Sequence, residues 1–458
     1  MPRRNAVLLL VVTLIAYACY VRAEQNPYAR YVAAGFSMID RWALYNEPNQ
    51  RQFDQQLYAA AMEQMVEVLR ARGDEHSMFV PATLKDRYRE VLTQEFVGIG
   101  IRFRLLGEPA VPVVLGPPEA DSPALAAGLR SGDRIVAVDG QATAGLDNDA
   151  IAQLIRGPQG STVTLTVERS DAEEPLEISV ERSVIFTASV TGVSRLSDGG
   201  WRYRLPGLPG AAFVQITKFG DKTLEELDAI LAELAAEPEG LAGLVIDLRG
   251  NGGGTLDAGV GISDLFLRAG RPIVTIRGRG GKVEEKFVST EAGDYAELPL
   301  AVLIDQDSAS AAEILAACLQ DYDRADIVGA RSYGKGTVQQ VLRLEGGRSL
   351  LKLTFATYWR PSGKNIHRMP DDGPDAQWGV SPTPGCEVHL EGDDLTTWLH
   401  FRLRQMTIGD AESPELAAAL DEAEMAVPAD YVDQALVLAV ERLAARMSEP
   451  DAAPANRP

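Results

Sequence analysis

Three short segments of the chain carry residue types that could together perform nucleophilic chemistry. The first runs from Asp247 to Gly254, follows a continuous apolar run and contains four glycines. Glycines at the start of a helix leave backbone N–H groups exposed, which is how an oxyanion hole is built. A phosphate-binding loop is the rival interpretation, but the segment has no Walker lysine and glycine spacing alone is a weak signal.

The second segment places a serine where a strand gives way to a helix. Within residues 305–315, Ser310 is expected to open a helix, so that its hydroxyl is exposed at the edge of a sheet. The N–H of Ala311 would then point to where an acyl oxyanion forms. Taken alone, a serine at this place is most often a simple N-cap. A serine nucleophile also needs a base.

The third segment, Tyr333 to Gln340, supplies a candidate base. Lys335 stands between two glycines, which is unusual in the strand expected here because glycine weakens strands. The glycines would allow close backbone approach and let the ammonium point inward, with Gln339 on the same strand face as Lys335. No histidine stands in a plausible triad order. As a base, Lys335 would need its pKa lowered from about 10.4 to near 7–8, and burial acts in that direction.

A fourth group of residues predicts peptide binding. Ser122 to Gly140 resembles the PDZ domain signature, with glycines where tight turns are needed and Asp139-Gly140 closing a hairpin. A small β-domain with ordinary glycine turns is the alternative. An upstream run matches the PDZ carboxylate-binding loop: Gly98, Ile99, Gly100 and Ile101. In such a loop, backbone N–H groups hold a terminal carboxylate while the peptide adds to a sheet edge.

The three catalytic segments, in this order, resemble the carboxyl-terminal processing proteases, the tail-specific protease family, over roughly residues 96–384. The resemblance implies that Ser310 is the nucleophile, Lys335 the general base and Gln339 the residue that orients the lysine. It also implies an oxyanion hole at Gly253 and the Ala311 amide. The separation of 25 residues between Ser310 and Lys335 fits the family spacing.

The resemblance leaves several residues with two interpretations. Arg156 ends the expected PDZ helix and is either a plain surface charge, favoured by the helix dipole, or a regulatory contact with the protease body, as in that family. The glycine run lacks the proline that usually sits second, and Ala312 replaces the last serine of the family's Ser-Ala-Ser-Ala-Ser run. We interpret His367 and Glu313 as structural.

Several elements must position these residues. We expect strands over 97–104, 135–138, 162–168, 176–181, 244–248 and 300–304, and helices over 147–155 and 310–319. With the resemblance, this predicts a multidomain α/β protein: a protease core of crotonase/Clp-like topology with an inserted PDZ domain and helical N- and C-terminal segments. The expected domains are a signal peptide or anchor at 1–23, a helical segment at 24–95, the PDZ domain at 96–184, the protease core at 185–410, a helical segment at 411–447 and a disordered tail at 448–458.

Composition excludes several classes of function. The net charge of −21 over 458 residues argues against nucleic-acid binding, which needs clustered Lys and Arg. The three cysteines, Cys19, Cys318 and Cys386, make neither a disulfide framework nor a metal cluster, and Cys318 is expected in the core. With four scattered histidines and no H-E-x-x-H motif, we expect no metal and no cofactor.

The N-terminus predicts export. Arg3 and Arg4 precede an apolar run, and Ala23 ends a small-residue cleavage site, which is the layout of a signal peptide. The apolar run is short for a span of about 20 residues, so cleavage is favoured over an anchor formed by residues 6–21. A lipoprotein at Cys19 is disfavoured by the bulky Tyr17. An extracytoplasmic location, periplasmic or secreted, is therefore expected.

The main interpretation is a serine endopeptidase that cleaves extracytoplasmic polypeptides near apolar C-termini captured by its PDZ domain. An inactive PDZ scaffold is the second, and acyl-CoA chemistry on a crotonase-like core is the third. The sequence leaves open which protein is cut, whether an adaptor activates the enzyme, and whether subunits assemble into a homo-oligomer.

Overall fold

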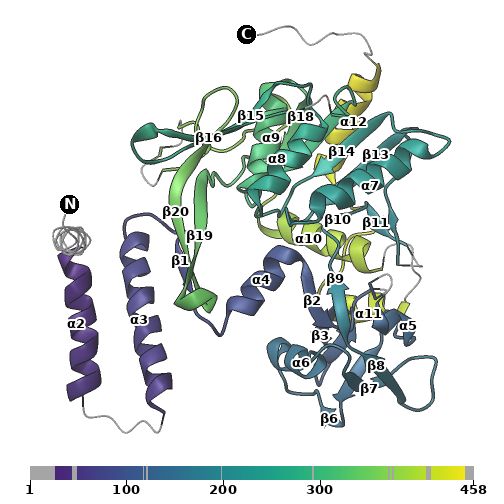
Figure 1. Ribbon diagram of the computed structural model, residues 1–458. Coiled ribbons are helices and arrows are strands. Elements are labelled where there is room, and N and C mark those ends of the chain that lie inside the picture. Colours follow the sequence, from purple (N-terminus) through teal and green to yellow (C-terminus); the bar gives the residue numbers. More distant parts are fainter. Residues whose placement is uncertain are drawn as a thin grey trace, which may run out of the picture. The chain divides into compact units, whose positions relative to one another are not determined.

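The computed structural model describes residues 26–43, 49–116, 118–119, 122–196, 199–290, 293–369, 372–373, 376–408 and 414–448. The expected signal segment, with Cys19, lies outside these residues, as does nearly all of the expected tail. Contacts divide the chain into two units, Met1–Pro81 with Val341–Leu353, and Ala82–Gln340 with Thr354–Pro458. Figure 1 shows the elements in chain order.

The first unit is built from helices α2 (Pro27–Trp42) and α3 (Gln50–Arg70) and a short strand, β1 (Met78–Val80). β1 pairs antiparallel with Leu350–Lys352 of β20 (Ser349–Trp359). The two helices lie where helical periodicity was expected, whereas a three-residue strand carries too little pattern to be predicted. No candidate site residue belongs to this unit.

The core of the second unit is a five-stranded sheet in the order β10-β13-β14-β17-β18. In this sheet β13, β14, β17 and β18 are parallel to one another, and β10 runs antiparallel at the edge. These strands are buried on both faces, as expected of parallel sheets. Their bounds are β10 (Val190–Thr191), β13 (Ala211–Ile216), β14 (Gly243–Asp247), β17 (Leu300–Ile304) and β18 (Ala325–Gly329).

Helices cover both faces of this sheet (Figure 1). Alternate strand residues such as Leu244 and Ile246 pack against α7 (Thr223–Ala236), α8 (Leu256–Leu265) and α9 (Ala311–Asp321). The residues between them pack against α12 (Gln434–Ser448) on the opposite face. The expected strand 300–304 is confirmed with its bounds, and the helix expected from Ser310 begins one residue later, with Ser310 as its N-cap.

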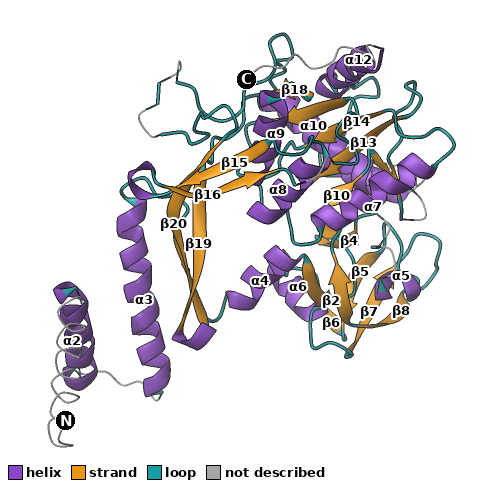
Figure 2. Cartoon of the chain, turned by 45° about the horizontal axis from the view of Figure 1, so that its top comes forward, coloured by secondary structure: helices purple, strands orange, loops and turns teal. Residues whose placement is uncertain are grey.

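Further strands flank this core (Figure 2). β15 (Pro272–Arg277) pairs antiparallel with β16 (Val283–Val288) and with Thr357–Trp359 of β20. β19 (Thr337–Leu344) begins two residues after Lys335. The prediction that Lys335 lies in a strand is therefore wrong: the lysine sits in the irregular segment before β19, where the glycines on both sides of it are tolerated.

The segment expected to be the PDZ domain forms its own sheet, in the order β3-β4-β5-β7-β8 with β6 on β5, while β2 pairs with β9. β3 is thus an edge strand. The single strand expected over 97–104 is wrong, because an irregular stretch at 99–102 separates β2 from β3. The elements are β2 (Glu95–Gly98), β3 (Phe103–Leu106), β4 (Val111–Val114), α5 (Pro123–Ala126), β5 (Arg134–Val138), β6 (Gln141–Ala142), α6 (Asn148–Ile155), β7 (Thr162–Glu168), β8 (Leu176–Glu181) and β9 (Ser183–Phe186).

Three C-terminal helices connect these parts: α10 (Gly392–Thr407), α11 (Pro414–Glu422) and α12. Leu416 and Leu420 of α11 pack against Leu106 and Val113 of the PDZ segment, whereas α12 lies on the parallel sheet. In the described ranges, no helix is long and apolar enough to cross a bilayer.

Candidate active site

Ser310 occupies a strained position between β17 and α9. It is the N-cap of α9 with φ 57° and ψ −115°, and 7% of it is exposed. A non-glycine residue with positive φ carries strain of roughly 1–3 kcal/mol, which persists only where the surroundings enforce it. Strain of this kind is common at active sites, and here it affects the residue expected to be the nucleophile.

A buried carboxylate joins the serine and lysine segments. Glu313 is fully buried, and its Oε2 accepts hydrogen bonds from Ser310 N and Lys335 N, both at 2.8 Å. Its Oε1 accepts from Gly334 N at 2.7 Å and from the Ser332 hydroxyl at 2.5 Å. One carboxylate oxygen therefore holds the backbones of both expected catalytic residues. Burial raises the pKa of Glu313 to about 6, although these hydrogen bonds act to lower it.

The two glycines beside Lys335 are explained by a neighbouring chain segment. A Cβ on Gly336 would lie 2.2 Å from the backbone nitrogen of His367, and one on Gly334, whose φ is 87°, would lie 2.8 Å from Arg368 and Trp378. Residues 366–368 thus run directly against the lysine segment, and the expected close backbone approach is found. Lys335 itself is partly buried.

Gln339 lies in β19, and its amide is held by two threonines. Its Nε2 donates to Thr337 Oγ1 at 2.8 Å and to Thr354 Oγ1 at 3.2 Å. These contacts fix the amide plane, so that the amide oxygen has a defined direction.

Gly253 lies against the serine, as expected of an oxyanion loop. With φ 92°, an added Cβ would meet Ala309 O and Ser310 Cβ at 2.7 Å and Ala311 N at 3.0 Å. The Gly253 N–H already donates to Asn251 Oδ1 at 2.8 Å. The Ala311 N–H has no acceptor among the described residues, so it is free to donate to a bound group.

Sequence reasoning missed two residues that shape this loop. Asn251 is fully buried, and its side-chain Nδ2 donates to Ile216 O at 2.6 Å. Its backbone carbonyl accepts from Ala309 N at 2.9 Å. Both carboxylate oxygens of Asp305 accept from Gly250 N at 3.0 Å. These bonds restrict the backbone of a glycine run that contains no proline. An asparagine inside a glycine run was the only available signal.

Two further polar groups border the site. Tyr358 is buried, which raises its pKa to about 12, and a hydrogen bond to Ser310 acts in the opposite direction. The Nδ1 of His367 is buried without a hydrogen-bond partner in the described structure. Neither group was assigned a chemical role from sequence.

The expected carboxylate-binding loop lies between β2 and the edge strand β3. Ile99 is buried, and Gly100 has φ 83° with its α-carbon hydrogens against Ser122. The carbonyls of Ile99 and Gly100 accept from Ala124 N and Glu119 N, and the N–H groups of Gly100 and Ile101 have no acceptor in the described ranges. Free donors beside an open strand edge are what peptide addition requires.

Arg156 is the C-cap of α6, and its contacts lie close to the PDZ sheet. Its Nη1 is 3.3 Å from Glu90 Oε2 of α4 (Lys85–Thr93), and its guanidinium lies 5.5 Å from the centre of the Phe96 ring. Both contacts are made by residues N-terminal to the PDZ sheet, outside the parallel sheet that carries Ser310.

Two parts of the chain match known protein families. The model of peptidase family S41 matches residues 210–382, and that of the PDZ domain matches residues 116–169. The carboxy-terminal-processing protease of Bartonella bacilliformis is 37% identical over 297 residues, 64% of this chain and 64% of that protein, so the match spans less than two thirds of that relative. A probable CtpA-like serine protease of Staphylococcus aureus (strain COL) is 30% identical over 382 residues, 81% of this chain and 72% of that protein. Among solved structures, the photosystem II D1 C-terminal processing protease is 26% identical with a TM-score of 0.42, covering 84% of this chain and 98% of that one.

Proposed function

Because the chain belongs to peptidase family S41, we propose that it is a serine endopeptidase in which Ser310 is the nucleophile and Lys335 the general base. The observation that carries this proposal is the single Glu313 oxygen that accepts from the backbone N–H groups of both residues at 2.8 Å. Two segments 25 residues apart in sequence are thereby held side by side.

In this mechanism a neutral Lys335 amine takes the proton from Ser310 Oγ, and Oγ attacks the carbonyl carbon of the scissile peptide bond. The N–H of Ala311 donates to the resulting oxyanion, and the loop at Gly253 closes the other side. The lysine ammonium then protonates the leaving amine, and the acyl-enzyme is hydrolysed by a water that Lys335 deprotonates. Gln339 orients the lysine.

The PDZ segment supplies substrate selection. The N–H groups of Gly100 and Ile101 receive a terminal carboxylate, Gly98 and Ile99 shape the loop, and the substrate extends along β3 towards cleavage near its C-terminus. In the same proposal Arg156, beside Phe96 and Glu90, has a regulatory role: it couples peptide binding by the PDZ segment to the activity of the protease core. The substrates are extracytoplasmic polypeptides, which rests on the signal-like residues 3–23. Their ends are apolar, which rests on Phe96, Val97 and Ile99 around the loop. The core takes the crotonase/Clp topology.

The test compares purified full-length protein with its Ser310→Ala and Lys335→Ala variants on an unfolded polypeptide with an apolar free C-terminus. Gel analysis is expected to show cleavage by the wild type alone. An inactive PDZ scaffold predicts capture of the polypeptide without cleavage by any of the three proteins. Cleavage by Ser310→Ala at the wild-type rate would remove the nucleophile assignment.

A further inference from the structure

The residue that leads into the oxyanion loop is a buried arginine held by two carboxylates. Arg249 stands directly before Gly250, and 4% of its side chain is exposed. It donates to both oxygens of Asp247 at 3.0 and 2.7 Å and to both oxygens of Asp433 at 3.0 and 2.9 Å. Asp247 ends the strand that carries the loop, whereas Asp433 comes from the segment between α11 and α12. The C-terminal part of the chain therefore reaches the base of the oxyanion loop.

A tryptophan of α10 completes this cluster. The Arg249 guanidinium lies 4.6 Å from the centre of the Trp398 ring, and Trp398 Nε1 donates to Asp433 Oδ2 at 3.1 Å. Burial acts to raise the pKa of Asp433, but Arg249 and these donors hold it below its ordinary value. Because buried charges are costly unless fully paired, each member of the cluster depends on the others for its place.

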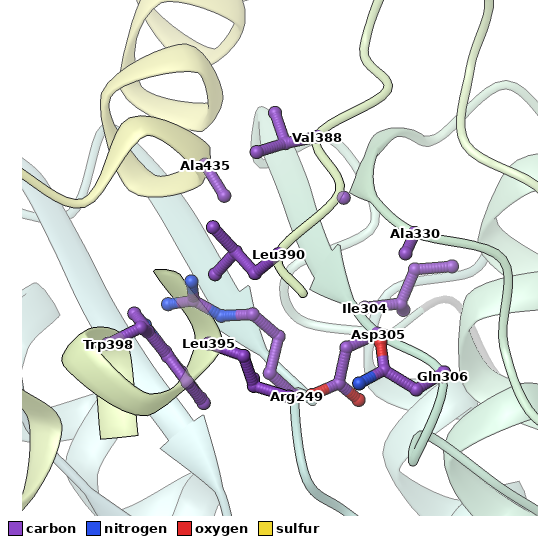
Figure 3. A pocket seen from close by; sticks show the side chains of 11 residues that line it. Arg249, Ile304, Asp305, Gln306, Ala330, Val388, Leu390, Leu395, Trp398 and Ala435 are labelled. Atoms are coloured by element: carbon purple, nitrogen blue, oxygen red, sulfur yellow. The ribbon is translucent and has the colours of Figure 1, made fainter. Parts of the chain in front are cut away.

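A small pocket lies beside the cluster, and Arg249 is one of its lining residues (Figure 3). Asp305, Trp398 and Ala435 also line this pocket. Asp305 is the residue that accepts both bonds from Gly250 N. The Arg249 side chain is held by its bonds to Asp247 and Asp433 and by the Trp398 ring.

We infer that Asp433 is a positioning residue for the oxyanion loop and acts through Arg249. Its bonds fix the guanidinium, the guanidinium fixes the turn at Gly250, and that turn sets where the loop meets Ser310 and the Ala311 N–H. Trp398 serves the same purpose by covering the guanidinium and donating to Asp433. This inference rests on the proposed serine-protease function, because only the proposed chemistry gives the loop a catalytic consequence.

The variant Asp433→Asn isolates this role. Asp433 also caps α12 by accepting from Leu436 N at 3.1 Å, and asparagine caps helices as well as aspartate does. The substitution therefore keeps the cap and removes one acceptor and the charge that face Arg249. A displaced oxyanion loop is expected to lower kcat by about 10- to 100-fold with KM within about twofold of wild type. The rate at which a fluorophosphonate modifies Ser310 should fall in parallel, because its phosphoryl oxygen occupies the same hole.

Two companion variants separate positioning from general damage. Asp421→Asn removes another ion pair of the C-terminal segment, the one with Arg404, and should leave kcat and KM at wild-type values. Arg249→Gln should be as slow as the double variant Arg249→Gln/Asp433→Asn, because residues that act through one another are not additive.

The outcomes are distinct. A folded Asp433→Asn protein with wild-type kcat, or one that changes KM alone, overturns the inference while leaving the protease intact. If Asp433→Asn does not fold, Arg249→Gln decides: it removes the guanidinium through which Asp433 would act, and an unchanged kcat in that folded variant also overturns the inference. If the wild type cleaves nothing, the proposed function fails instead.

Discussion

At the scale of single residues, the site depends on side chains that hold backbone rather than substrate. Glu313 accepts four hydrogen bonds from the segments of Ser310 and Lys335. Asn251 and Asp305 likewise hold the backbone of the glycine loop by hydrogen bonds. A carboxylate is suited to this because an ionised one only accepts hydrogen bonds and has room for four. We therefore expect the protonation state of Glu313 to decide whether the segments of Ser310 and Lys335 keep their relative positions.

We expect kcat/KM to fall more steeply with decreasing pH below about pH 6, where Glu313 takes up a proton. A protonated carboxyl turns one oxygen into a donor, so at least one of its four partners loses its acceptor. In the proposed mechanism, protonation of the base contributes one unit of slope to log(kcat/KM), and protonation of Glu313 should add a second below about pH 6. The measurement is kcat/KM from about pH 5 to about pH 8.

This inactivation should not come from unfolding at Glu313. Its folded pKa of about 6 lies above the ordinary value of 4.5, so the folded chain binds this proton more tightly than the unfolded chain does. The stability contributed by protonating Glu313 is full below 4.5 and is lost as the pH rises through about 6. Circular dichroism should thus report a folded, inactive protein on the acid side. Glu313→Gln should be slow throughout and lack the added slope, and a uniform slope in wild type would contradict the assignment.

The assignment of the base is tested by substitutions at Lys335 and Ser310. Lys335→Arg should be inactive, since a guanidinium stays protonated and cannot accept the serine proton. The double variant Ser310→Ala/Lys335→Ala should be no slower than either single one, because a nucleophile and its base act as a unit. The alternative base is His367, which packs on Gly336. Loss of turnover in a folded His367→Ala protein together with an active Lys335→Ala protein would reassign the base.

At the scale of elements, the site is formed where loops pass too close for side chains. Gly253→Ala would place a methyl group 2.7 Å from both Ala309 O and Ser310 Cβ. We expect loss of detectable cleavage and a fall of roughly 1–3 kcal/mol in the free energy of unfolding. Gly270→Ala is the matched control, because Gly270 also has positive φ, at 77°, but nothing within 4 Å of an added Cβ. Both variants are compared by denaturant melting and by kcat; equal kcat values would show that the contact with Ser310 does not matter.

Elements could be predicted from the sequence where a local pattern decided the structure. The buried strand at 300–304 could be predicted because a five-residue apolar run between turns is too short for a helix. The residues after Ser310 predicted that it stands at the start of a helix. Lys335 was wrongly assigned to a strand because the reason for its glycines lies in His367 and Arg368, which approach from elsewhere in the chain. Likewise Asp433 meets Arg249 across 184 positions, a distance at which no spacing pattern operates.

At the scale of the whole molecule, the PDZ segment should read free, apolar C-termini. The N–H groups of Gly100 and Ile101 are open to a carboxylate, and Phe96, Val97 and Ile99 make the surroundings apolar. Amidating the C-terminus of a substrate removes the charge that these donors bind, and ending it in Asp buries an unpaired charge, which costs several kcal/mol. Both changes should raise KM more than they lower kcat. Equal kinetics for free, amidated and Asp-ended substrates would refute C-terminal reading and leave the protease assignment standing.

The contact between Asp433 and Arg249 also has a temporal consequence. A ribosome makes the chain from its N-terminus, so Ser310, Lys335 and the glycine loop all exist before Asp433 has been added. If the oxyanion loop needs Asp433, a growing or prematurely ended chain carries a nucleophile and a base but no working enzyme. The protein would thus become able to cut other polypeptides only after Asp433 has been added, and copies that end before it would be inactive.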